Sequence, residues 1–142
     1  MSSHPRVRLI SATAPLLDAL IDDPTRFEEL IGSPVPDGWP EFPEAIESTL
    51  AHFKNAPGTD RSWSMQFFVD DATGRLVGSG GFAAPPVERT VEIGYEVAPE
   101  FRGQRFGVTA ARALVELAVA SGQVDPDVGT VWEWRWTRQS EA

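Results

Sequence analysis

The 142-residue sequence contains no cysteine and only two histidines. Without cysteine there is no disulfide, no thiolate metal site and no covalent acyl-cysteine intermediate. His4 lies near the N-terminus and His52 on a helix flank, and neither belongs to a spacing typical of metal ligands. We therefore expect no bound metal, and any group transfer should be direct.

Long apolar runs are also missing. No segment approaches the ~20 residues of a membrane span, and Met1 to Arg8 lacks the apolar core of a signal peptide. The formal net charge of -9 repels nucleic acid and anionic lipid surfaces. These absences favour a cytoplasmic protein that binds neither nucleic acid nor membrane.

The chain length and its 42% hydrophobic content fit one domain with one core over residues 1–142. Hydrophobic periodicity, caps and turn residues predict an α+β protein. The expected strands span residues 6–10, 63–69, 75–83, 90–97 and 130–137. The expected helices span residues 14–21, 24–31, 44–55 and 105–121. Ser11 or Thr13 caps the first helix, Asp23 caps the second, and Gly32 ends the second.

Three glycines at 78, 80 and 81 mark either a bulge or close backbone approach, or alternatively a poorly packed strand edge.

Residues Thr90 to Gly122 form the most informative stretch: an apolar strand, a turn rich in glycine and arginine, and a long amphipathic helix. The first backbone N–H groups of a helix lack intrahelical acceptors and carry partial positive charge, so they bind phosphate. Gly103 and Gly107 permit close approach of the backbone. The segment 102–112 carries three arginines and no acidic residue, against the net charge of the chain. The pattern predicts a pyrophosphate site.

The residues of this stretch resemble the GNAT superfamily of N-acetyltransferases. The family loop reads Arg or Gln, two residues, Gly, one residue, then Gly or Ala, and this chain has Arg102-Gly103-Gln104-Arg105-Phe106-Gly107. Arg105 stands where the family has its first glycine, and it either tolerates the required backbone angles or weakens the loop. The phrases GSGGF (78–82), EIGYEVAPEFRG (92–103) and TAARALVELA (109–118) are similar to the branch that includes ribosomal-protein N-terminal acetyltransferases.

The resemblance implies an acyl-CoA N-acyltransferase-like fold, with a mixed, mostly antiparallel sheet flanked by helices. It implies acetyl-CoA as cosubstrate and a primary amine, either a protein N-terminus or a small amine, as acceptor. Main-chain groups at the strand end would contact the pantetheine arm, and the loop would hold the pyrophosphate. The implied cofactor-binding residues are Val97, Ala98, Pro99, Arg102, Gly103, Gln104, Arg105, Phe106, Gly107 and Val108.

On the acceptor side, the resemblance assigns Glu92 as the base that removes or relays the amine proton. Strand alternation places Glu92, Gly94 and Glu96 on one face, and Val91, Ile93, Tyr95 and Val97 on the other. The alternative is that Glu92 is an ordinary exposed strand residue. Within the Pro-rich loop 33–43, Trp39 and Phe42 either line the acceptor groove or anchor the loop on the core.

The resemblance ends after the cofactor helix. A family member would continue with a strand, a helix and two further strands, whereas only residues 123–142 remain. The alternating segment TVWEWRWT (130–137) is similar to the last strand of the family, so we expect that the chain lacks part of the family's C-terminal half. The missing helix would commonly carry a tyrosine that protonates the leaving thiolate, and the only tyrosine here is Tyr95, so the proton is expected from water.

Without the missing strand, segment 90–97 would be an exposed apolar edge. Either strand 130–136 pairs with it in parallel through a right-handed crossover, or two chains exchange this strand in a homodimer. The alternative to an active enzyme is a catalytically impaired acyl-CoA-binding or dimerising module.

Overall fold

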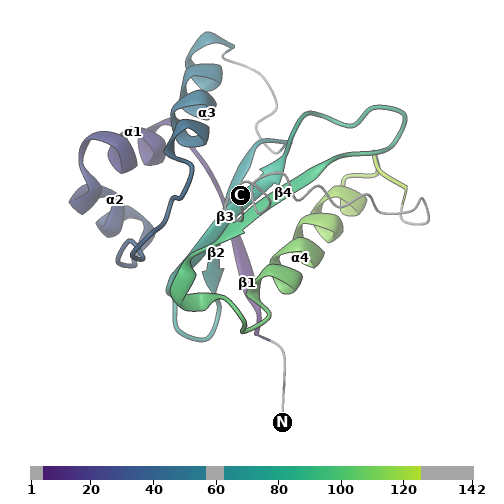
Figure 1. Cartoon of the computed structure of the whole chain (residues 1–142). Coiled ribbons are helices and arrows are strands. Elements are labelled where there is room, and N and C mark those ends of the chain that lie inside the picture. Colours follow the sequence, from purple (N-terminus) through teal and green to yellow (C-terminus); the bar gives the residue numbers. More distant parts are fainter. Residues whose placement is uncertain (1–4, 57–62, 126–142) are drawn as a thin grey trace.

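The computed structural model describes residues 5–56 and 63–125, and within them the fold is a four-stranded sheet with helices on both faces (Figure 1). The strands are β1 (Val7–Ser11), β2 (Met65–Asp70), β3 (Leu76–Phe82) and β4 (Ile93–Val97), in the order β1-β2-β3-β4, and every neighbouring pair is antiparallel. The helices are α1 (Ala14–Asp22), α2 (Pro24–Ile31), α3 (Pro43–Asn55) and α4 (Phe106–Ala120), with a short 3-10 helix, η2 (Pro99–Phe101), between β4 and α4. Figure 1 shows α1, α2 and α3 on one side of the sheet and α4 on the other.

The α+β class is confirmed. The parallel strand that would make the sheet mixed was expected at 130–136. That segment lies outside the described residues. The structure therefore tests neither its pairing with β4 nor its exchange in a homodimer. No helix of the described segments is long and apolar enough to cross a bilayer.

The helix ends follow the local signals of the sequence. Thr13 Oγ1 accepts a hydrogen bond from Leu16 N–H at 3.2 Å and caps α1, and Asp23 Oδ1 accepts one from Arg26 N–H at 3.3 Å and caps α2. Gly32 ends α2 in the left-handed conformation, with φ of 79°. These caps confirm the predicted boundaries, because short-range hydrogen bonds determine them.

The glycines of β3 permit close backbone contact inside the sheet. A Cβ atom on Gly78 would collide with the carbonyl oxygen of Glu96, and one on Gly81 with that of Ser64. β3 is an interior strand, buried along its whole length. The interpretation as close backbone approach is therefore confirmed, and that as a poorly packed edge is wrong.

The core lies on both faces of the sheet. On the side of α1 and α2, the rings of Phe27, Trp39 and Phe67 pack together, with centroid distances of 5.4 to 6.4 Å. On the other side α4 buries one stripe of side chains against β1 and β4: Phe106, Ala110, Leu114 and Ala118. Small alanines in this stripe let the helix axis approach the sheet closely.

β4 begins at Ile93, three residues later than the predicted start at Thr90. The preceding residues form a tight turn in which Val87 and Thr90 exchange two backbone hydrogen bonds of 3.0 Å. Glu88 and Arg89 occupy the turn with φ of 51° and 63°. Two successive positive φ angles are typical of a type I′ hairpin turn. The turn shortens the strand, so Glu92 lies just before it.

Candidate active site

The loop before α4 builds an exposed helix start. Gly103 and Arg105 both adopt positive φ, 79° and 71°, and Phe106 begins the helix. Arg105 therefore adopts a left-handed conformation that glycine enters without strain, at a cost of about 1 kcal/mol. In the described part of the chain no side chain caps this helix. The first N–H groups of α4 are consequently available to an anion.

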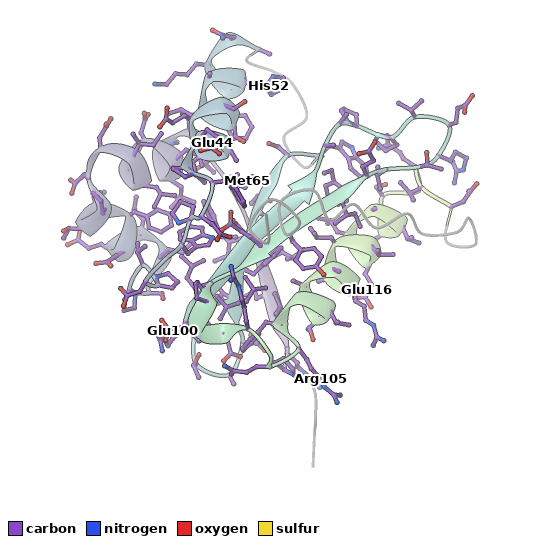
Figure 2. All side chains as sticks on the ribbon, in the orientation of Figure 1. Glu44, His52, Met65, Glu100, Arg105 and Glu116 are labelled. Carbon is purple, nitrogen blue, oxygen red and sulfur yellow. The ribbon has the colours of Figure 1, made fainter. Side chains whose placement is uncertain are left out.

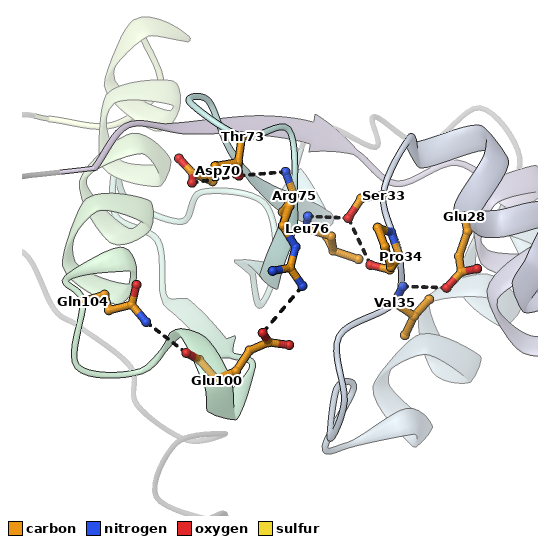
Figure 3. Close-up of polar contacts among 10 residues, drawn as sticks. All are labelled: Glu28, Ser33, Pro34, Val35, Asp70, Thr73, Arg75, Leu76, Glu100 and Gln104. Carbon is orange, nitrogen blue, oxygen red and sulfur yellow. Dashed lines mark hydrogen bonds and ion pairs between the residues drawn. The ribbon is translucent and has the colours of Figure 1, made fainter.

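Arg102 turns back onto the protein. Its Nε donates to the carbonyl oxygen of Val97 at 2.8 Å, and its Nη2 donates to Glu41 Oε2 at 3.3 Å. Gln104 Nε2 likewise donates to the carbonyl of Glu100 at 2.9 Å (Figure 3). Arg102 thus fastens the loop to the end of β4 and to the loop before α3, while Arg105 is exposed at the helix start (Figure 2).

The outer edge of β4 runs directly into this loop. Ala98 N–H donates to Val77 O at 2.8 Å and Glu92 O accepts from Ala83 N–H at 3.1 Å, so the even-numbered residues direct their amide groups toward β3. Because successive amides of a strand point to opposite sides, those of Ile93, Tyr95 and Val97 point to the outer edge. Among the described residues no strand pairs there. The predicted contacts at Val97, Ala98 and Pro99 therefore lie between an open strand edge and the start of α4.

Tyr95 explains the glycine in the first turn of α4. A Cβ atom on Gly107 would lie 3.0 Å from Cε2 of the Tyr95 ring, so the glycine makes room for the tyrosine. Burial raises the pKa of the Tyr95 phenol to about 12. The phenol therefore stays protonated at neutral pH.

Glu96 is a buried acid that was not singled out from the sequence. Its side chain is on the face opposite to Tyr95, 7% exposed, and its Oε1 accepts from Glu41 N–H at 2.8 Å. Burial raises the pKa of this carboxyl, and the Glu41 carboxylate adds to the rise; hydrogen bonds from the backbone and the Arg102 charge oppose it. Strand alternation places Glu96 on the same face as Glu92, but only Glu92 was assigned a role by the resemblance.

Glu92 itself is exposed and precedes β4. Its position keeps it on the same face as Glu96, with Gly94 between them. Its role as a base stays a prediction.

The loop 33–42 is held at several points. Ser33 Oγ accepts from Leu76 N–H at 2.8 Å, and Glu28 Oε2 accepts from Val35 N–H at 2.7 Å (Figure 3). Trp39 is 4% exposed, and its Nε1 donates to Ser79 Oγ at 3.1 Å. Trp39 is thus an anchor within the core, and Phe42 is half-buried immediately before α3. The loop therefore has a fixed shape over the end of β4.

The ionisable groups do not form a metal site in the described segments: no group of three or more His, Cys, Asp or Glu side chains is placed to hold an ion.

This geometry, a β4 edge that no described strand pairs with, followed by a glycine-containing loop and a helix start, agrees with the comparison with known proteins. Residues 7–135 match the family model of the acetyltransferase (GNAT) domain. The chain belongs to the GNAT family. The match confirms the resemblance found in the sequence, and it makes this chain a member of a family of acetyltransferase enzymes.

Solved structures of GNAT enzymes share the fold. One is the Salmonella typhimurium acetyl transferase that modifies the N-terminal serine of 50S ribosomal subunit protein L7/L12; its TM-score is 0.51 at 15% identity, over 87% of this chain and 69% of that chain. Another is a spermidine N-acetyltransferase chimera from Vibrio cholerae and hSSAT; its TM-score is 0.53 at 16% identity, over 84% of this chain and 67% of that chain. A comparison with curated proteins finds no match. At such identities the likeness concerns the fold alone.

Proposed function

We propose that this GNAT protein transfers the acetyl group of acetyl-CoA to a primary amine. The observation that carries the proposal is the N-terminus of α4, which no described side chain caps and which follows the outer edge of β4 through a loop with two left-handed residues. We further propose that it acts in the cytoplasm, on an amine substrate and not on nucleic acid or membranes.

On the donor side, the N–H groups of Phe106, Gly107 and Val108 would hold the pyrophosphate, with Gly103 and Gln104 forming the turn below it. Arg105 adds a cation at the helix start, where a charge-assisted bond to phosphate is strong. Arg102 has a different part, because its guanidinium already binds Val97 O and Glu41. It positions the loop relative to β4.

On the acceptor side, the amine nitrogen attacks the thioester carbonyl carbon, the C–S bond breaks, and the sulfur leaves as a thiolate. The thiolate takes its proton from water, which is feasible because a thiol has a pKa of about 8.5. The amine proton passes to a carboxylate. Glu92 is the first candidate, since it is exposed on the acceptor face and can relay the proton to solvent.

Glu96 is the second candidate for this carboxylate. Burial raises its pKa, which makes the carboxylate a stronger proton acceptor than an exposed one, but Glu41 N–H already occupies one oxygen. The variants Glu92→Gln and Glu96→Gln separate the two. The base variant should lose about 100-fold or more in kcat and lose the acidic limb of the pH profile, whereas the other should keep both.

The transferase itself is tested by thiol release from acetyl-CoA over a panel of primary amines. The protein contributes no thiol background, because it has no cysteine. Amine-dependent release with matching acetylated product is the expected result. Binding of acetyl-CoA without turnover of any amine would instead support the acyl-CoA-binding module, which the unpaired outer edge of β4 within the described residues favours.

A further inference from the structure

A cavity of about 540 Å³ lies between α3 and the adjoining ends of β2 and β3. Figure 2 shows His52 and Glu44 on α3, above the strand that carries Met65. The cavity is lined by α3, by β2 and β3, and by the segments just before β2 and just after β3, including Ser48, His52, Phe53, Trp63, Gly81 and Phe82.

The cavity exists because glycines form part of its floor. Across the sheet, Phe67, Ser79 and Glu96 form one row of paired residues, and Trp39 and the loop 33–42 cover it. The next row on the same face, two residues along each strand, consists of Met65, Gly81 and Gly94. Two of its three members have no side chain. Within the described residues, the sheet therefore has little side-chain bulk under α3, immediately beside the row that contains Glu96.

The lining determines what the cavity can bind. Phe53, Trp63 and Phe82 supply aromatic surface, and the Trp63 and Phe82 rings meet at 5.0 Å. The Thr49 hydroxyl donates a hydrogen bond to the carbonyl oxygen of Ala45 at 2.8 Å, so its hydrogen is not available to a ligand. Among the described residues of the lining, His52 is the only ionisable one, and none carries a carboxylate. A second ammonium group, as in a polyamine, would find no counter-charge there.

Charge is placed at the edge of the cavity instead. Gly94 is the β4 member of the row Met65, Gly81 and Gly94. Glu92 and Glu96 lie two residues before and after it, on the same face of the chain, each about 7 Å away along the backbone. An ammonium group over Gly94 would meet a carboxylate on both sides. The carbon atoms attached to it would extend over Gly81 into the aromatic lining.

We infer that this cavity holds the carbon body of the acceptor, and that the acceptor is a primary amine attached to an apolar, preferably aromatic, group. The inference rests on the proposed transferase function and specifies its substrate class. Two kinds of molecule carry a primary amine next to an apolar group: a free arylalkylamine, and a peptide whose first side chain is apolar. A polyamine or a peptide that begins with a small polar residue lacks the apolar group.

The test compares four acceptors with the full-length protein and acetyl-CoA: 2-phenylethylamine, a tetrapeptide amide beginning with Phe, the same peptide beginning with Ser, and spermidine. Burial of a phenyl group should raise kcat/KM about 10-fold to 100-fold for one or both apolar acceptors over the other two. If only one of the two apolar acceptors shows this rise, that one identifies the source.

A variant pair tests the location. Ser48 is exposed on α3 and lines the cavity, so Ser48→Trp should fill it and lower kcat/KM for the preferred acceptor at least 10-fold. Ala51 is exposed on the same helix outside the lining, and Ala51→Trp should leave kcat/KM unchanged. Calorimetry without acetyl-CoA should show that Ser48→Trp weakens binding of 2-phenylethylamine and that Ala51→Trp does not. Melting curves serve to check that both variants fold.

The outcomes separate the two proposals. Acetylation of spermidine or the Ser peptide at least as fast as the apolar acceptors, or equal loss in both tryptophan variants, would overturn the cavity assignment while the transferase stands. Binding of 2-phenylethylamine that Ser48→Trp abolishes, with no acetylation of any amine, would keep the cavity as an amine site and overturn the transferase.

Discussion

A carboxylate placed in the first turn of α4 should weaken acetyl-CoA binding without harming the fold. Val108 is the third residue of the helix and 50% exposed. Val108→Glu therefore adds a negative charge beside the N–H groups proposed to hold the pyrophosphate. Val108→Gln is the matched control, because it has the same size and shape without the charge.

The magnitude follows from the geometry. Three residues rise about 4.5 Å along the helix axis, and a surface side chain reaches about 5–6 Å from that axis. Together these put the Glu carboxylate about 7 Å from an anion on the axis at the helix start. Coulomb's law gives about 0.6 kcal/mol per charge pair at that distance in bulk water and about 2.4 kcal/mol at an effective dielectric of 20. Because the position is half exposed, about 1 kcal/mol per charge is reasonable, or about 2 kcal/mol for the two charges of a pyrophosphate.

Salt lowers this value. The Debye length is about 8 Å at 0.15 M salt, so roughly half of the effect should persist. The Kd of Val108→Glu should then exceed that of Val108→Gln by about 5-fold at 0.15 M salt and about 30-fold at low salt. The free energy of unfolding should not fall, since an acid in the first turn stabilises a helix by about 0.3–1 kcal/mol.

Calorimetric titration of acetyl-CoA at two salt concentrations measures both values of Kd, and urea denaturation measures the stability. Equal Kd for the two variants at low salt would refute the placement of the pyrophosphate on α4.

Two further predictions concern the fold that holds the site. Burial raises the pKa of Glu96 above its ordinary value of 4.5. The folded state is therefore stabilised fully by the neutral carboxyl below pH ~4.5, and it loses this stabilisation as the pH rises through the folded-state pKa. Glu96→Gln stays neutral, so its Tm should exceed that of the wild type at pH 7 and the difference should shrink toward pH 4; a constant difference in thermal melts would argue against a buried charge. Gly78→Ala should lower the free energy of unfolding by about 2–4 kcal/mol, because its Cβ meets the backbone at Glu96. Gly32→Ala should cost only about 1 kcal/mol, because its Cβ meets nothing within 4 Å and only the left-handed angle is strained; similar losses for both glycines in urea titrations would contradict this distinction.

The sequence predicted the features that local chemistry determines. The caps at Thr13 and Asp23 and the end of α2 at Gly32 depend on neighbours within three or four residues, so a linear pattern contains them. The type I′ turn at Glu88 and Arg89 has neither Asn nor Gly, the usual residues with positive φ. No local signal therefore indicated that β4 starts only at Ile93.

The parts that the sequence did not predict depend on long-range contacts. Glu41 binds Glu96 across 55 residues and Arg102 across 61, so neither the burial of Glu96 nor the inward turn of Arg102 was visible in their own segments. The cavity under α3 requires the strand register that pairs Gly81 with Gly94. Only the folded sheet brings these glycines together.

If the start of α4 holds the pyrophosphate of acetyl-CoA, removing that group from the ligand should weaken binding. The most direct measurement is a calorimetric titration of the wild-type protein with acetyl-CoA and, in parallel, with S-acetylpantetheine, which lacks the pyrophosphate and the nucleotide. We expect one acetyl-CoA site per chain, and binding of S-acetylpantetheine at least ~30-fold weaker, a loss of about 2 kcal/mol. Equal affinity for the two compounds, or no binding of acetyl-CoA, would contradict it.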